Sequence, residues 1–194
     1  MKILYLTNTN AENINELPNF MRTYGDEVDI YFNKINKEYF AEKKIDFIVS
    51  DRYQFLIKQD VIDTMQGKII NLHPSYLPWN KGYHSNFWSI YDKTTKGVSI
   101  HYVDEGIDTG DIAIQKKVSF NEKDTLKTTY QKLRVSIVEL FFYNWIDIKN
   151  NNTQRIKQIS EGSIHYKKEL DALFQKLPKG WDTKVFEIEQ RKYF

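Results

Sequence analysis

The chain contains no cysteine among its 194 residues. Disulfide bonds and thiolate metal sites are therefore excluded, which fits a reducing compartment. The chain also has little excess charge, since 28 Lys and Arg residues against 26 Asp and Glu residues give a net charge of +2. Without a long basic tract, binding of nucleic acid through a broad positive patch is disfavoured.

No apolar run in the sequence is long enough to cross a bilayer. The first ten residues, MKILYLTNTN, lack the long apolar core and the small-residue cleavage site of a signal peptide. We therefore expect a soluble, cytoplasmic protein without a membrane partner.

Signatures of several chemistries are missing as well. There is no Walker loop and no GxGxxG motif, so neither hydrolysis of a nucleoside triphosphate nor a dinucleotide cofactor is indicated. No histidine spacing suits zinc, and Gly106 stands where a calcium loop needs an oxygen ligand. Ser75 lies near His73, but the GxSxG motif of a serine nucleophile is absent. We expect no metal in the site.

The first 72 residues alternate short apolar runs with short helical patterns. The runs KILYLT, EVDIYF, DFIVS and KIINL occupy residues 2–7, 27–32, 46–50 and 68–72. Such alternation indicates an α/β fold with a Rossmann-like, mostly parallel sheet. The helical patterns between the runs cover residues 12–24, broken by Pro18, then 38–44 and 58–65.

The pattern changes after residue 97. Two further strands are expected at residues 98–103 and 112–118, and they precede the longest helical pattern, Leu126–Ile148. After Asn150 the composition turns polar. We expect a catalytic domain over residues 1–150 and a small C-terminal appendage over residues 151–194.

Polar side chains stand where the strand at residues 68–72 ends. Asn71 and His73 are two residues apart, so in an extended segment they point to the same side. Ligands of open α/β sheets bind beyond the carboxyl ends of the strands. Pro74 biases His73 toward extended geometry. The pattern indicates a polar pair held in a fixed direction.

A third candidate, Asp108, lies in the loop DEGIDTGD at residues 104–111. Glycine lets a backbone approach a ligand closely, so this loop can bring a carboxylate to a site. His101 stands on the strand before the loop. It is either a partner of the site or a buried histidine, and the sequence leaves both open.

The segments NLHPSYLPWNKG, residues 71–82, and GVSIHYVDEGIDTGDI, residues 97–112, together resemble the formyltransferases that use N10-formyltetrahydrofolate. The resemblance implies the formyltransferase fold, with Asn71, His73 and Asp108 as the catalytic residues. Asn71 would donate a hydrogen bond to the oxyanion, and His73 would take the amine proton or support the oxyanion. Asp108 would orient the imidazole or pass a proton. The segment before Asn71 is short for the family, which implies a shortened N-terminal half.

The resemblance also implies residues that bind the formyl donor and the substrate. For each of them the alternative to ligand binding is packing in the core or simple exposure at the surface. The formyl donor N10-formyltetrahydrofolate would be held by loops before and after the catalytic strand: Arg52, Tyr53, Gln54, Phe55, Leu56, Val103, Asp104, Glu105, Gly106 and Ile107. The amino-sugar substrate would be bound around the proline turn, by Lys81, Gly82, Tyr83, His84, Asn86 and Trp88.

Branches of this family differ in features that the sequence can address. Methionyl-tRNA formyltransferases have an additional C-terminal domain, and formyltetrahydrofolate hydrolases have a preceding regulatory domain; this chain is short for either. Glycinamide ribonucleotide formyltransferases have a glycine-rich phosphate loop after the first strand, whereas LTNTNAENINEL, residues 6–17, has no glycine. PWNKGYHSNFWSIYD, residues 78–92, is similar to the sugar N-formyltransferases.

We therefore expect an enzyme that formylates the primary amine of a nucleotide-linked amino-deoxysugar. A dTDP-linked 3- or 4-amino-dideoxyhexose is favoured, for O-antigen or other surface-glycan synthesis such as that of lipopolysaccharide. The alternatives are an enzyme like glycinamide ribonucleotide formyltransferase, and a non-catalytic binding module with this fold. The aromatic cluster of Phe141, Phe142, Tyr143 and Trp145 exceeds the needs of one helix face and indicates a homodimer contact.

Overall fold

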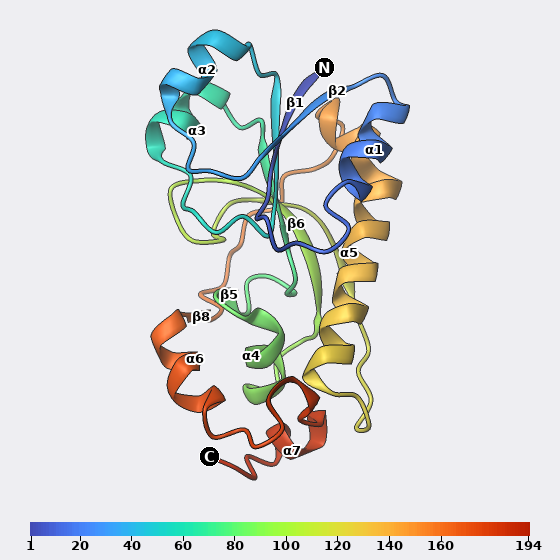
Figure 1. Cartoon of the computed structure of the whole chain (residues 1–194), viewed down its shortest axis with the longest axis vertical. Coiled ribbons are helices and arrows are strands. Elements are labelled where there is room, and N and C mark those ends of the chain that lie inside the picture. The colour runs from blue at the N-terminus through green and yellow to red at the C-terminus, as the bar shows by residue number, and fades with distance from the viewer. The chain divides into compact units, whose positions relative to one another are not determined.

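The computed structural model describes residues 1–40 and 42–194 in full, and Figure 1 labels many of its helices and strands. The elements follow in chain order: β1 (Lys2–Leu6), α1 (Glu16–Thr23), β2 (Glu27–Tyr31), α2 (Lys37–Lys43), β3 (Phe47–Asp51), α3 (Gln59–Met65), β4 (Ile69–His73), β5 (Lys81–Gly82), α4 (Ser85–Tyr91), β6 (Gly97–Tyr102), β7 (Ile112–Lys117), α5 (Leu126–Lys149), β8 (Ile164–His165), α6 (Lys167–Phe174), the 3-10 helix η1 (Gly180–Asp182) and α7 (Val185–Glu189).

The central sheet has six strands in the order β2-β1-β3-β4-β6-β7. β1 pairs in parallel with β2 and β3, and β3 pairs in parallel with β4. The backbone N–H of Val103 donates to the carbonyl of Ile69 at 3.0 Å, so the end of β6 lies beside the start of β4. The expected α/β fold with a mostly parallel sheet is confirmed.

The N-terminal part alternates strand and helix without interruption from β1 to β4. Its helices are seven or eight residues long, and the shortened N-terminal half stays a prediction. The sequence predicts that Pro18 breaks the helix over residues 12–24. In the structure α1 begins at Glu16, so Pro18 falls in the first turn, where the missing N–H has no helical partner to lose.

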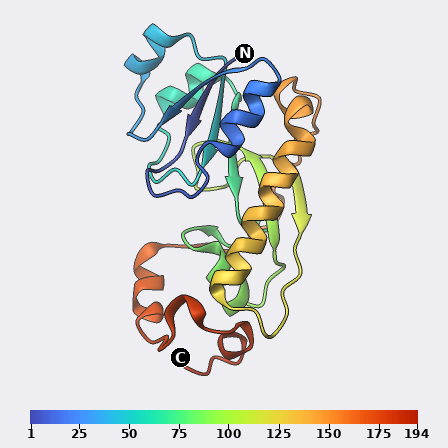
Figure 2. The same cartoon turned by 45° about the vertical axis from the view of Figure 1, so that its right-hand side comes forward.

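Helices cover both faces of the parallel strands, as Figure 2 shows for α2 and α3 on one side and for α1 and the end of α5 on the other. Leu4 of β1 packs in a buried cluster with Phe40 of α2 and Val61 of α3. On the opposite face the ring of Phe47 meets Trp145 of α5 edge to face, with centroids 5.6 Å apart. Burial on both faces explains why these strands are continuous apolar runs.

The chain forms two compact units, each built from separate segments. The first unit comprises Met1–His73, Ile100–Ala113 and Phe141–Lys157, and the second comprises Pro74–Ser99, Ile114–Leu140 and Gln158–Phe194. Each unit joins segments from both sides of residue 150. The division into a domain of residues 1–150 and an appendage of residues 151–194 stays a prediction.

Residues after 158 contribute to the core of the second unit. Leu170 of α6 and Val185 of α7 share a buried cluster with Phe87 and Trp88 of α4. The short strands β5 and β8 also pair in parallel, in a separate two-stranded sheet. The segment after residue 158 therefore packs on α4 and pairs with β5, the elements that follow the proline turn.

The 24-residue helix α5 carries the aromatic residues from which a homodimer contact is predicted. Phe141 and Trp145 are fully buried, whereas Tyr143 is 84% exposed. The buried members are explained by packing within the first unit, and the homodimer stays a prediction. Among the helices that the structure describes, none is both long and apolar enough to cross a membrane.

Candidate active site

Asn71 and His73 lie at the carboxyl end of β4, and their side chains meet one carboxylate, as predicted from their spacing. The amide Nδ2 of Asn71 donates to Oδ1 of Asp108 at 3.2 Å, and Nδ1 of His73 lies 3.4 Å from Oδ2 of the same residue. Leu72 between them is buried in the core. His73 itself is only 5% exposed, so its imidazole has a defined position in the first unit.

The loop that presents Asp108 is closed by its own side chains. Oδ1 of Asp104 accepts a hydrogen bond of 2.6 Å from the Thr109 hydroxyl. At Gly110 a Cβ atom would overlap the carbonyl oxygen of Tyr102, so only glycine fits. Asp108 has a φ of +53°, which is uncommon for a residue with a side chain and recurs at functional sites. The closed loop thus directs the carboxylate toward β4.

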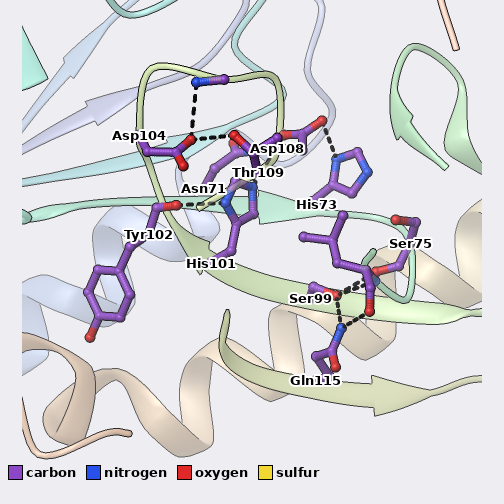
Figure 3. Close-up of polar contacts among 12 residues, drawn as sticks. Asn71, His73, Ser75, Ser99, His101, Tyr102, Asp104, Asp108, Thr109 and Gln115 are labelled. Atoms are coloured by element: carbon purple, nitrogen blue, oxygen red, sulfur yellow. Dashed lines mark hydrogen bonds and ion pairs between the residues drawn. The ribbon is translucent and has the colours of Figure 1, made fainter. Parts of the chain in front are cut away.

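His101 of β6 completes the cluster (Figure 3). Its Nε2 lies 3.2 Å from Oδ1 of Asp108 and 3.2 Å from Nδ2 of Asn71. Its Nδ1 lies 2.8 Å from the carbonyl oxygen of Tyr102, which can only accept, so this nitrogen carries a hydrogen. The sequence left His101 between a site partner and a buried histidine; it is 2% exposed and contacts the site.

The cluster unites an amide donor, two imidazoles and one carboxylate. A hydrogen on Nδ1 of His73, directed at Asp108, leaves the lone pair on Nε2, which is the state of a general base. The amide of Asn71 is a donor of the type that stabilises an oxyanion. Within the described residues, no three His, Cys, Asp or Glu side chains are grouped to hold a metal ion. The arrangement suits removal of a proton from an amine beside a stabilised oxyanion.

Arg52, the first residue predicted to bind folate, follows β3, which is the neighbour of β4 in the sheet. Its φ is +59°, and its Nε donates to the Asp51 carboxylate at 3.2 Å. Asp51 is fully buried and also accepts a 2.9 Å hydrogen bond from the Tyr5 hydroxyl. Sequence reasoning did not identify Tyr5 and Asp51, because nothing local marks two apolar strands as the source of a buried polar pair.

The other residues predicted to bind folate lie in the loops after β3 and β6. The Tyr53 hydroxyl is used by the fold: it donates to the carbonyl of Asn33 at 2.7 Å and accepts from the N–H of Ile35 at 3.0 Å. Burial of this ring raises the pKa of Tyr53. The remaining predicted residues are partly or well exposed: Gln54, Phe55, Leu56, Val103, Asp104, Glu105, Gly106 and Ile107.

Two residues predicted to bind the sugar donate side-chain hydrogen bonds inside the second unit. Nζ of Lys81 donates to the carbonyl of Glu161 at 3.0 Å, and Lys81 is 9% exposed. Nδ2 of Asn86 donates to the carbonyl of Leu126 at 2.9 Å, and Asn86 is buried. These contacts hold the fold together, and the assignment of both residues to substrate binding stays a prediction.

The other four residues of that set divide between the fold and the surface. The ring of Trp88 is buried and stacks on His165 with centroids 3.9 Å apart. Gly82 lies in the short strand β5. Tyr83 is 39% exposed and His84 is partly exposed, so these two offer side chains to a ligand.

The turn after β4 is held by a polar cluster within the second unit, drawn in Figure 3. The Ser99 hydroxyl donates to the carbonyl of Ser75 at 2.7 Å and accepts from the N–H of Leu77 at 3.1 Å. Nε2 of Gln115 donates to the carbonyl of Leu77 at 2.8 Å. The rigidity predicted from the prolines therefore depends also on side chains of β6 and β7.

Comparison with known families and curated proteins gives consistent matches. Residues 6–142 match the family described as formyl transferase. A methionyl-tRNA formyltransferase from Prochlorococcus marinus is 33% identical over 127 residues, which are 64% of this chain and 38% of that protein. A phosphoribosylglycinamide formyltransferase from Bacillus subtilis is 38% identical over 92 residues, which are 46% of this chain and 47% of that protein. The chain thus spans less than half the length of these two relatives.

Comparison with solved structures extends the similarity over nearly the whole chain. The formyltransferase PseJ from Anoxybacillus kamchatkensis was solved in complex with UDP-4,6-dideoxy-4-formamido-L-AltNAc and tetrahydrofolate. It is 39% identical, with a TM-score of 0.91 and coverage of 97% of both chains. The match therefore includes residues beyond 142, where the family model ends.

Proposed function

The chain belongs to the formyl transferase family, and from this premise we propose that it is an N-formyltransferase acting on a nucleotide-linked amino sugar. The formyl donor in this proposal is N10-formyltetrahydrofolate. One observation carries it: Asn71, His73 and Asp108 form one hydrogen-bonded cluster at the end of β4. A module that only binds a ligand has no need of an oxyanion donor, a base and an orienting carboxylate together.

The catalytic roles follow from the geometry of the cluster. His73 takes the proton of the attacking amine, which must be neutral when it reaches the formyl carbon. Asp108 orients the imidazole through Nδ1 at 3.4 Å and stabilises its charged form. Asn71 donates its amide hydrogen bond to the oxygen that becomes negative. One such donor lowers the barrier by about 3 kcal/mol. When the bond between N10 and the formyl carbon breaks, the proton taken up by His73 goes to N10 of the leaving tetrahydrofolate.

The loops after β3 and β6 fit the formyl donor by their chemistry. When bound, N10-formyltetrahydrofolate supplies the formyl group. Leu56, which is 71% exposed, and the partly exposed Phe55 offer apolar surface to a flat ring system. Arg52, with its side chain 17% exposed, offers a cation to the carboxylates of the glutamyl tail. The two loops follow β3 and β6, and both of these strands are neighbours of β4, which carries Asn71 and His73.

The nucleotide-sugar substrate is proposed from the 39% identity to PseJ, whose complex contains a UDP-linked 4-formamido sugar. The sequence alone favoured a dTDP-linked 3- or 4-amino sugar. The similarity instead favours a UDP-linked 4-amino-4,6-dideoxyhexose, with the dTDP-linked sugars as the alternative. Use of the product in O-antigen or another surface glycan stays a prediction from the sequence.

A panel assay tests the proposed function. Purified protein and N10-formyltetrahydrofolate are incubated separately with UDP-, dTDP- and GDP-linked 3-amino and 4-amino deoxysugars, and products are weighed by mass spectrometry. We expect one added formyl group on a UDP-linked 4-amino sugar. Protein with His73→Ala serves as the inactive control.

Glycinamide ribonucleotide belongs in the same panel, because the phosphoribosylglycinamide formyltransferase from Bacillus subtilis is 38% identical over 92 residues. Formylation of that compound alone would replace the sugar proposal with the purine-precursor reaction. Absence of product from every acceptor, with folate still bound, would favour the binding module.

A further inference from the structure

The second unit contains a cluster of aromatic rings centred on Trp181, which we call the ring cluster: Tyr83, His84, Tyr130, Phe174 and Trp181. The Trp181 ring lies 5.3 Å from that of His84, 5.4 Å from Phe174 and 6.4 Å from Tyr130, measured between centroids. The Tyr83 ring meets His84 edge to face at 4.4 Å. All five residues belong to the second unit.

The rings are packed together but not covered. Trp181 and Tyr83 each expose 39% of their surface, and His84, Tyr130 and Phe174 are partly exposed. By contrast, Trp88, on the same helix that His84 precedes, is buried against His165. The ring cluster therefore holds its shape through internal contacts while leaving aromatic surface available.

Backbone pairing fixes the direction of Tyr83 and His84. The N–H of Tyr83 donates to the carbonyl of His165 at 2.9 Å, and that of Lys81 donates to the carbonyl of Ser163 at 2.9 Å. A Cβ atom at Gly82 would overlap the carbonyl oxygen of His165, so this approach requires glycine. The C-terminal segment thus sets Tyr83 in place and itself supplies Phe174 and Trp181.

His84 has the properties of a recognition residue. It directly precedes α4 with a left-handed φ of +56°, which fixes the direction in which its side chain leaves the backbone. Burial lowers the pKa of His84, and Asp171 and Lys167 of α6 act on it in opposite senses. In its neutral form, which burial favours, the imidazole presents one donor and one acceptor.

We propose that the ring cluster binds the pyrimidine base of the nucleotide sugar, with Trp181 stacking on the base. This inference rests on the proposed function and names the residues that would select the nucleotide. Bases stack on aromatic side chains with substantial gain, because every base has a flat π face. The imide edge of uracil carries donor and acceptor groups together, which matches a neutral histidine and not a charged one.

Direct titration of the full chain with UDP tests the proposal independently of turnover. Isothermal titration compares UDP with inorganic pyrophosphate, which has the phosphates but no base. We expect Trp181→Ala to weaken UDP binding about tenfold or more, and Trp181→Phe to retain most of it. Tyr83→Ala, which removes a largely exposed ring, is expected to weaken binding as well. Tyr143→Ala, at an 84% exposed tyrosine of the first unit, is the matched control and should bind as the parent does.

Steady-state kinetics with the sugar found in the panel assay complete the test. Trp181→Ala should raise the KM for the nucleotide sugar while the KM for the formyl donor stays within twofold. An unchanged UDP affinity in both Trp181→Ala and Tyr83→Ala would overturn the proposal, as would an effect on the formyl donor alone. If the protein formylates no sugar but binds UDP in a way that depends on Trp181, the proposed function is wrong and the proposed base-binding site is supported.

Discussion

The Nε2 atom of His101 lies 3.2 Å from Oδ1 of Asp108, while the other oxygen of that carboxylate faces His73 at 3.4 Å. One carboxylate is therefore shared by two buried imidazoles. A change in the position of His101 therefore reaches the catalytic base through Asp108. His73 therefore acts on the substrate directly, whereas His101 acts only through Asp108.

Removing either catalytic side chain should greatly slow turnover without preventing binding of folate. For His73→Ala we expect kcat to fall about 100- to 10,000-fold, because the proton acceptor is lost. For Asn71→Ala we expect a fall of about 100- to 1000-fold, the usual effect of deleting an oxyanion donor. Stopped-flow or steady-state rates and a folate-binding titration measure both effects. Turnover by His73→Ala at the parent rate would show that the base lies elsewhere.

His101 is expected to act as a positioning residue. With His101→Phe the Asp108 carboxylate loses its polar neighbour at 3.2 Å, so Asp108 holds His73 less firmly. We expect kcat to fall about tenfold while both KM values stay within twofold, and we expect the polar amide of His101→Gln to recover part of the loss. Equal losses in the two variants would instead mean that His101 only fills space in β6.

Asp26 should contribute stability that depends on pH. Its side chain is 1% exposed and is held by Lys149 at 2.9 Å, by Trp145 at 3.0 Å and by the amine of Met1 at 3.1 Å. Burial alone would raise the pKa of Asp26, but these donors together hold it below the ordinary value of 3.8. The stabilisation is therefore complete well above pH 3.8 and is lost as the pH falls through the lowered pKa of the folded state.

Urea unfolding of Lys149→Met at pH 7 tests this arrangement. We expect a loss of about 3–5 kcal/mol, because a buried carboxylate is left without its main cation. The deficit should shrink at pH 3. Lys2→Met is the control: Lys2 pairs with the exposed Glu27 at 3.3 Å, and such surface pairs contribute about 0–1 kcal/mol. Equal losses in the two variants would contradict the role given to Asp26.

Two glycines with similar backbone angles should respond differently to a methyl group. Gly82 has a φ of +84° and Gly25 has a φ of +77°, so alanine at either position costs about 1–2 kcal/mol in backbone energy. Gly25 has open space for a Cβ atom, whereas at Gly82 the methyl overlaps the carbonyl oxygen of His165. Gly82→Ala should therefore be the less stable variant in urea unfolding. It should also raise the KM for the nucleotide sugar, which Gly25→Ala should leave unchanged.

Local sequence patterns were sufficient for the strands and for part of the site. Parallel strands buried on both faces appear as continuous apolar runs, so β1, β3 and β4 were predictable. The spacing of Asn71 and His73 predicted a common direction, since side chains alternate along a strand. Asp108 was assigned through the family motif, and the structure places it within hydrogen-bonding distance of Asn71.

Contacts between distant segments were beyond the reach of the sequence. β8 is two residues long and has no periodicity to detect, yet it pairs with β5, about 80 residues earlier in the chain. The motif around Lys81 and Trp88 pointed to a substrate pocket, but motif similarity does not give the direction of a side chain. Lys81 proved to be bonded to the backbone of Glu161. The sequence did not predict a role for Trp181, because the rings that it contacts lie in three other parts of the second unit.

The pairing of β5 with β8 has a consequence for attempts to change the nucleotide preference of such enzymes. Tyr83 and His84 follow one strand of that pair, and Trp181 belongs to the segment that begins with the other. Transplanting only the proline turn from a relative would leave its aromatic side chains facing a foreign partner strand. A successful graft would have to carry residues 78–84 and 162–181 as a single cassette.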